Sequence, residues 1–220
     1  MVVALDGPAG VGKSTVSKRA AETAGLHYLN SGNFYRAVTL GAAEAGLDLE
    51  NREAVEEFAR GMDLAYDRGR FLLEGRDRTD ELHSDLVDAH VAQVSAFRGV
   101  REYVNGWLRR VSAALDIVVE GRDITTVVFP DAELKVYLDA SPEVRARRRF
   151  AQGTSEKSLD EIAENIRRRD AIDRGKAWGR FVQADDAFYL DTSVLTIEEV
   201  CDKVIRKIQE IQQRIEETES

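Results

Sequence analysis

One nine-residue stretch near the start of the chain limits the possible folds more than any other feature. Residues 7–15 read GPAGVGKST and follow a short apolar run at residues 2–6. The stretch fits the pattern G-x-x-x-x-G-K-[ST], in which glycines let consecutive backbone N–H groups point at one anion and the following helix adds its positive end. It therefore predicts a phosphate-binding loop between a strand and a helix.

The residue types in this loop predict how a nucleoside triphosphate is held. We expect the lysine ammonium to reach the β- and γ-phosphates and the serine hydroxyl after it to ligate Mg²⁺, which makes Ser14 the one expected metal ligand. The residues expected to bind the triphosphate are Gly7, Pro8, Ala9, Gly10, Val11, Gly12, Lys13, Ser14 and Thr15.

Short apolar runs alternate with helical patterns along the rest of the chain. Runs rich in Val, Leu or Tyr predict strands at residues 2–6, 26–29, 116–121, 133–139 and 187–191. A helical pattern from Lys13 to Ala24 ends at Gly25, and capping signals predict further helices that begin near Ser141, Ser158 and Thr196. This order predicts an α/β, three-layer fold with a mostly parallel five-stranded sheet. Residues 63–75 break the pattern and predict an inserted hairpin.

Composition narrows the functional classes. A chain of 220 residues with 43% hydrophobic residues can bury a full core in one domain. Its formal charge of −9 argues against broad binding to nucleic acid, and no apolar run is long enough to span a membrane. The single cysteine, Cys201, is expected to be a buried small hydrophobe, and one cysteine fits a reducing compartment. With no export signal, we expect a cytoplasmic protein.

Several classes of protein share this loop. A GTPase would need Asn-Lys-x-Asp to read guanine, and no asparagine here precedes a lysine. A small kinase must bind a second substrate opposite the loop and exclude water, so it needs cationic groups from separate segments. Such groups occur at residues 31–36, 97–101 and 120–123, and residues 145–180 carry eleven Lys or Arg against six Asp or Glu.

The sequence resembles one family of these kinases nearly from end to end. The motifs DGPAGVGKST, NSGNFYR, EGRDITTVVFPDA, LDASPEVRARRR, RRRDAIDRG and ADDAFYLDTS occur in this order, as they do in bacterial cytidylate kinases, members of the nucleoside monophosphate kinases. The resemblance implies transfer of a phosphoryl group from MgATP to CMP or dCMP, with ATP at the loop.

The resemblance also implies that the single domain consists of a core, a substrate-binding subdomain and a lid. The core would comprise about residues 1–30, 100–145 and 180–220. The subdomain that binds the nucleoside monophosphate would span about 31–99, and a helical lid about 146–176. We expect a monomer that binds ATP and CMP or dCMP and has no nucleic-acid or membrane partner.

Site residues follow from the same resemblance, position by position. Arg36, Arg122 and Arg169 would hold the acceptor phosphate, Asp173 its ribose, and Arg101 and Asp123 the cytosine. The full expected set for the acceptor is Ser31, Arg36, Arg101, Arg122, Asp123, Arg169, Asp173 and Lys176. The expected catalytic cations are Lys13, Arg122, Arg145 and Arg149. A nucleotide phosphate is already an anion, so no general base is expected.

Some positions depart from the usual pattern of the family. Ala92 stands where a serine commonly contacts the base, and Ser95 lies one turn away. Thr125 replaces a glycine, which suggests an altered loop where positive φ was tolerated. Lys176 replaces an arginine at the acceptor phosphate, and residues 181–182 replace a Pro-Leu pair. We expect cytosine preference to survive through Arg101 and Asp123 but to be weaker against UMP.

Two other hypotheses remain open at this point. A kinase of another small metabolite, such as shikimate or dephospho-coenzyme A, would need a carboxylate base for its hydroxyl acceptor, and Asp123 or Asp6 could serve. A non-catalytic nucleotide sensor would keep the loop for binding alone.

Overall fold

The computed structural model describes residues 1–67, 69–151, 153, 157–175 and 182–219, with the backbone alone at 169, 172–174 and 219. Contacts divide the chain into two compact units, and each is described by itself. Unit 1 comprises Met1–Tyr28 and Leu115–Ser220, and unit 2 comprises Leu29–Ala114. None of the described helices has the length and apolar character needed to cross a membrane.

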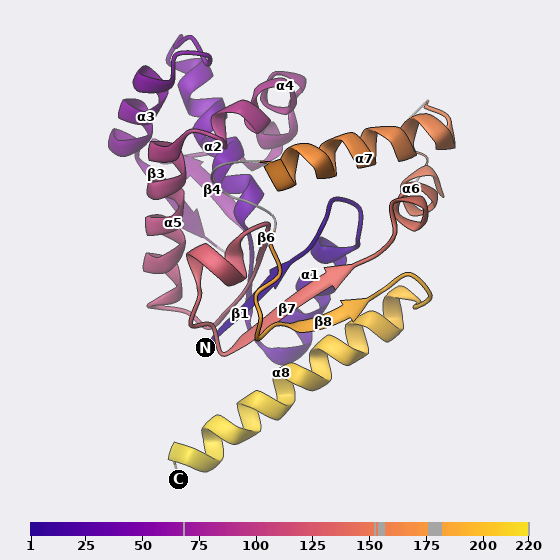
Figure 1. Ribbon diagram of the computed structural model, residues 1–220. Coiled ribbons are helices and arrows are strands. Elements are labelled where there is room, and N and C mark those ends of the chain that lie inside the picture. The colour runs from indigo at the N-terminus through magenta and orange to yellow at the C-terminus, as the bar shows by residue number, and fades with distance from the viewer. Residues whose placement is uncertain (68, 152, 154–156, 176–181, 220) are drawn as a thin grey trace. The chain divides into compact units, whose positions relative to one another are not determined.

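Five strands form the main sheet, in the order β2-β6-β1-β7-β8. Figure 1 labels four of them, β6, β1, β7 and β8. They are β1 Val2–Asp6, β2 His27–Asn30, β6 Ile117–Gly121, β7 Leu134–Asp139 and β8 Phe188–Asp191. β1 pairs in parallel with β6 and β7, and β7 pairs in parallel with β8. The α/β class and all five predicted strands are confirmed, with no strand end shifted by more than one residue.

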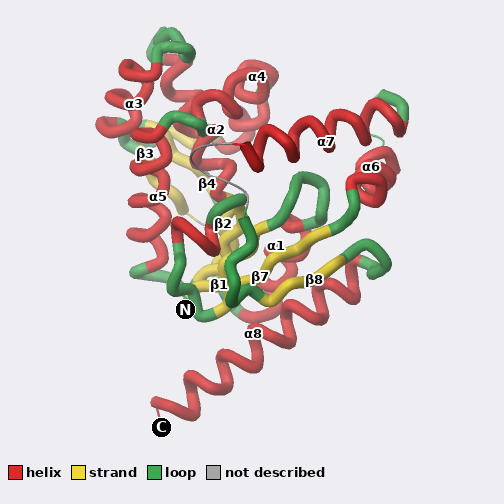
Figure 2. The backbone as a smooth tube through the Cα atoms, in the orientation of Figure 1, coloured by secondary structure: helices red, strands yellow, loops and turns green. Residues whose placement is uncertain are grey.

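The helices of unit 1 are α1 Lys13–Ala24, α6 Pro142–Ala151, α7 Leu159–Gly175 and α8 Ile197–Glu219, with a π-helix at Ile124–Val128. α1 and α8 pack against each other and against the sheet (Figure 2), and Cys201 is fully buried there, as predicted. The capping box of α7 is formed, because Ser158 N donates to Glu161 Oε2 at 2.8 Å and Glu161 N donates to Ser158 Oγ.

Unit 2 is mainly helical around a small antiparallel sheet. Its helices are α2 Ser31–Glu44, α3 Arg52–Gly61, the 3₁₀ helix Thr79–His83, α4 Asp85–Val94 and α5 Arg98–Ser112. The predicted hairpin is confirmed as β3 Leu64–Asp67 and β4 Arg70–Leu73. A third strand, β5 Arg76–Asp77, was not predicted, because two charged residues give no strand pattern.

Helix α5 packs within unit 2, although the division expected from the sequence places residues from 100 onward in the core. The reason is its packing on α2 and α3, where Trp107 joins an aromatic cluster with Phe34 and Tyr66. The Trp107 indole N–H also donates to Leu64 O at 3.0 Å.

Candidate functional site

The phosphate-binding loop connects β1 to α1, as the motif predicts. Gly10 and Gly12 have φ of +78° and +98°, which side-chain-bearing residues rarely adopt. Gly7 is required for a different reason, since a Cβ there would lie 2.3 Å from Leu138 O on β7. Leu138 O is a backbone atom and cannot move aside as a flexible side chain could, so the loop requires glycine at its start.

Lys13 and Ser14 open α1, at its positive end. The Lys13 Nζ donates to Gly7 O at 2.7 Å and to Pro8 O at 2.9 Å, and the residue is only 7% exposed. The ammonium is thus held over the loop that would bind phosphate. Ser14 and Thr15 are exposed in the first turn of α1.

The residues present fit a magnesium ion that arrives with a triphosphate. Among the described residues no group of three or more His, Cys, Asp or Glu side chains could hold a metal ion. Mg²⁺ at phosphate-transfer sites takes few protein ligands and draws the others from phosphates and water. An exposed serine hydroxyl beside a phosphate loop suits that kind of binding.

Asp6, the last residue of β1, is fully buried and holds the segment that follows β6. Its Oδ1 accepts from Ile124 N at 3.0 Å, and its Oδ2 accepts from Thr125 N at 2.8 Å and Thr125 Oγ1 at 2.7 Å. Burial raises the pKa of the Asp6 carboxyl, and the bonds from Thr125 and Ile124 oppose that rise. Thr125 does not have positive φ, so its side chain is accommodated in this loop without backbone strain.

Arg122 and Asp123 lie between the end of β6 and this π-helix. Arg122 is half-buried, and its Nη1 donates to Gly121 O at 3.2 Å. Asp123 is 4% exposed and occupies the N-cap position, but its side chain makes no capping hydrogen bond. Helix capping therefore does not account for the aspartate at this position.

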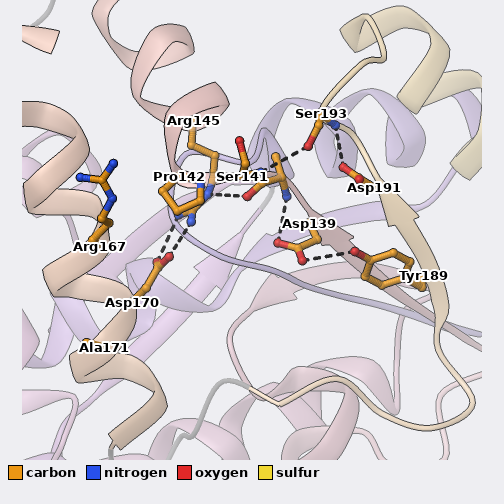
Figure 3. A pocket seen from close by; sticks show the side chains of 11 residues that line it. Asp139, Ser141, Pro142, Arg145, Arg167, Asp170, Ala171, Tyr189, Asp191 and Ser193 are labelled. Carbon is orange, nitrogen blue, oxygen red and sulfur yellow. Dashed lines mark hydrogen bonds and ion pairs between the residues drawn. The ribbon is translucent and has the colours of Figure 1, made fainter. Parts of the chain in front are cut away.

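Arg145, one of the expected catalytic cations, has protein partners for all of its guanidinium nitrogens. Its guanidinium is buried and makes a bidentate ion pair with Asp170 on α7, at 3.1 and 2.5 Å (Figure 3). Nη1 also donates to Ala9 O in the phosphate loop at 3.1 Å, and Nε donates to Ala140 O. These partners occupy the fork, so the structure makes Arg145 a link between α6, α7 and the loop.

Two neighbouring arginines of α6 differ from Arg145 in their exposure and in their partners. Arg149, the other expected catalytic cation of α6, is exposed. Arg148 donates to Thr192 Oγ1 and Thr192 O and so fixes the turn after β8. Desolvation lowers the pKa of the Arg148 guanidinium, although it remains protonated at neutral pH.

A cavity of about 330 Å³ opens beside this link, at the carboxyl ends of β7 and β8 (Figure 3). Its lining combines charged side chains, among them Arg145, Asp170 and Asp191, with apolar ones such as Pro142 and Ala171. In parallel sheets, ligands bind outside the carboxyl ends of the strands, which is where this cavity lies.

Unit 2 carries three of the expected acceptor residues. Ser31 is buried at the start of α2. Arg36, also on α2, donates through Nη1 to Asp88 Oδ1 at 2.5 Å and to Leu82 O at 2.9 Å. Arg101 on α5 lies 5.4 Å from the ring centroid of Tyr35, an arrangement typical of a cation–π contact.

Ser95, one turn away from Ala92, makes hydrogen bonds within unit 2. Ser95 Oγ donates to Ala92 O at 3.0 Å, and Ser95 O accepts from Arg101 Nη1 at 3.1 Å. Ser95 therefore orients Arg101. The predictions for Arg169, Asp173 and Lys176 lie outside the described side chains.

Comparisons with known proteins agree with this arrangement of motifs. The model of a family described as cytidylate kinase matches residues 3–210. A cytidylate kinase from Borrelia hermsii is 39% identical over 211 residues, covering 94% of this chain and 97% of that protein. A cytidylate kinase from Caldanaerobacter subterraneus is 39% identical over 210 residues, covering 94% and 93%. The chain belongs to the cytidylate kinase family.

Solved structures extend the likeness at the level of the fold. An uncharacterized protein from Eubacterium ventriosum superimposes with a TM-score of 0.54 at 11% identity, covering 96% of this chain and 98% of its own. The protein TT1252 from Thermus thermophilus gives a TM-score of 0.51 at 15% identity, covering 95% and 96%.

The structure of this cytidylate kinase family member shows positioning residues that the sequence analysis missed. Asp170 pairs with Arg145, Asp88 pairs with Arg36, and Thr125 donates to Asp6. Only the Thr125 position carried a signal in the sequence, as a departure from the family pattern.

Proposed function

We propose that this protein transfers the γ-phosphoryl group of MgATP to CMP or dCMP, giving ADP and CDP or dCDP. The observation that carries the proposal is the glycine-dependent loop with Lys13 at its centre, in a chain whose family membership extends over residues 3–210. We further propose that it acts as a cytoplasmic monomer without nucleic-acid or membrane partners.

On the donor side, the loop N–H groups and the positive end of α1 would bind the triphosphate. Lys13 would exchange the carbonyls of Gly7 and Pro8 for β- and γ-phosphate oxygens. Mg²⁺ ligated by Ser14 would neutralise phosphate charge. Arg145 would act by holding the Ala9 carbonyl of the phosphate loop in place. Arg149 is exposed, so it would be the lid cation that contacts phosphate.

On the acceptor side, each proposed residue suits one chemical group of the nucleotide. Arginines grip a phosphate in bidentate fashion, which suits Arg36 and Arg122. A carboxylate accepts from the cytosine N4 amine but repels the carbonyl oxygen of uracil, which suits Asp123. Ser31 and Arg101 complete the described part of this proposed set, and Arg169, Asp173 and Lys176 belong to it through the resemblance alone.

No general base is part of the proposed mechanism. The acceptor phosphate is an anion at neutral pH, so catalysis consists of positioning and charge neutralisation. The alternative kinase with a hydroxyl acceptor would need a carboxylate that can take a proton. Asp6 is a poor candidate, since it is fully buried and both of its oxygens already accept hydrogen bonds. The lid at about 146–176 would exclude water, the competing acceptor.

The experiment is ADP release on mixing MgATP with CMP, dCMP, UMP and AMP in parallel, with shikimate as a hydroxyl acceptor. The proposal expects the fastest release with CMP or dCMP. Transfer to the hydroxyl compound but not to CMP would favour the other kinase. ATP binding without turnover on any acceptor would favour the nucleotide sensor.

A further inference from the structure

We infer that the Thr125 hydroxyl positions Arg122 and Asp123 for the acceptor nucleotide by completing a three-donor clamp on the Asp6 carboxylate. This inference rests on the proposed function, because it assigns Thr125 to the acceptor side of the same reaction. Thr125 acts through Asp6 and the backbone, so it is a positioning residue.

The clamp joins two segments that lie far apart in the sequence. Asp6 Oδ2 accepts from both the backbone N and the Oγ1 of Thr125, at 2.8 and 2.7 Å, and Oδ1 accepts from Ile124 N at 3.0 Å. Asp6 and Thr125 are 0% and 1% exposed, so water cannot replace a missing donor.

Arg122 and Asp123 are held between this clamp and the sheet. On their amino-terminal side, Gly121 is the register partner of Asp6 where β6 pairs with β1. On their carboxyl-terminal side, Ile124 and Thr125 donate to the same Asp6. A segment of two residues fixed at both ends has little freedom, and Asp6 is the common anchor.

The hydroxyl is the one donor of the three that a substitution can remove without changing the backbone. A hydrogen bond to a charged acceptor is worth roughly tenfold to a hundredfold in an equilibrium constant. Part of this loss would appear as displacement of Arg122 and Asp123. The phosphate loop depends instead on its glycines and on the hydrogen bond from Arg145 Nη1 to Ala9 O, so donor binding should change little.

The test compares Thr125→Val, which keeps the branched shape, with Thr125→Ser, which restores the hydroxyl. Thr126→Val is the matched control, since Thr126 is the next residue of the same π-helix and is only half-buried. We expect Thr125→Val to raise KM for CMP about fivefold or more and to leave KM for ATP within about twofold. Thr125→Ser and Thr126→Val should stay within about twofold of wild type for both substrates.

A second readout is hydrogen exchange at the Ile124 and Thr125 amides, which is independent of turnover. In Thr125→Val these two amides should exchange faster than in wild type, and in Thr125→Ser they should be as protected as in wild type. Unchanged protection, an equal rise in both KM values, or failure of the serine variant to recover would each overturn the inference. Should wild-type protein not phosphorylate CMP, the proposed function fails, and the exchange experiment alone decides whether the clamp depends on the hydroxyl.

Discussion

The buried ion pair between Arg145 and Asp170 gives the sharpest stability prediction. The side chains are 2% and 8% exposed and meet in bidentate geometry. Substitution of Asp170 by leucine would leave the guanidinium buried without its carboxylate. Breaking a buried pair from one side typically costs about 3–5 kcal/mol. Against a typical total of about 5–15 kcal/mol, this loss is a large fraction of the stability of a domain.

The same two helices carry a matched control. Arg167 on α7 donates to Glu143 on α6 at 2.8 Å, but both side chains are about half exposed, at 49% and 51%. Exposed pairs of this kind contribute little, because water and salt screen both charges. Glu143→Gln should therefore leave the unfolding midpoint almost unchanged, although it also breaks an ion pair between α6 and α7.

Thermal unfolding of a double-mutant cycle measures the effect. Asp170→Leu should lower Tm by roughly 6–20 °C, as expected for 3–5 kcal/mol in a chain of this size. Adding Arg145→Met should recover most of the loss, since an apolar pair of similar volume often replaces a buried ion pair without cost. A decrease in Tm no larger than that of Glu143→Gln, or a Tm of the double variant no higher than that of Asp170→Leu, would refute the reasoning.

Three further predictions concern binding and pH. Asp88→Asn should lower KM for CMP about twofold to fivefold, because the carboxylate of Asp88 competes with the acceptor phosphate for Arg36; a raised KM would contradict this competition. Hydrogen bonds from Arg78 lower the pKa of the Glu81 carboxyl in the folded protein. The pair therefore stabilises the folded state at pH values above the pKa of Glu81 in the unfolded chain, and this stabilisation is lost as the pH falls through the pKa of Glu81 in the folded protein. The difference in urea midpoint between wild type and Arg78→Met should thus shrink from pH 7 to pH 3, and a constant difference would count against the pair. Asp123→Ala should reduce the ratio of kcat/KM for CMP over UMP, and an unchanged ratio would remove Asp123 from base recognition.

Much of the fold follows from local signals that the sequence displays. Gly25 ends α1 with φ of +70°, and the capping box of α8 forms between Thr196 and Glu199, as their spacing predicts. The phosphate loop is likewise readable, because its function depends on residues that are consecutive in the chain. Such features can be predicted from neighbouring residues, without information on contacts between distant parts of the chain.

The positioning residues could not be predicted in this way. Arg145 belongs to a run of arginines on one helix, and which of them is buried depends on Asp170, 25 residues further along. Thr125 donates to a carboxylate 119 residues away in the sequence, where the neighbouring strands β1 and β6 end side by side. The sequence shows a threonine and a carboxylate, but only the folded sheet brings them within hydrogen-bonding distance.

The most direct test of the central claim follows the γ-phosphorus of ATP. Wild-type protein mixed with MgATP labelled at the γ position and CMP should place the label in the β-phosphate of CDP, and Lys13→Met should abolish this transfer. Label that appears only in inorganic phosphate, or in CDP at an undiminished rate with Lys13→Met, would contradict the account.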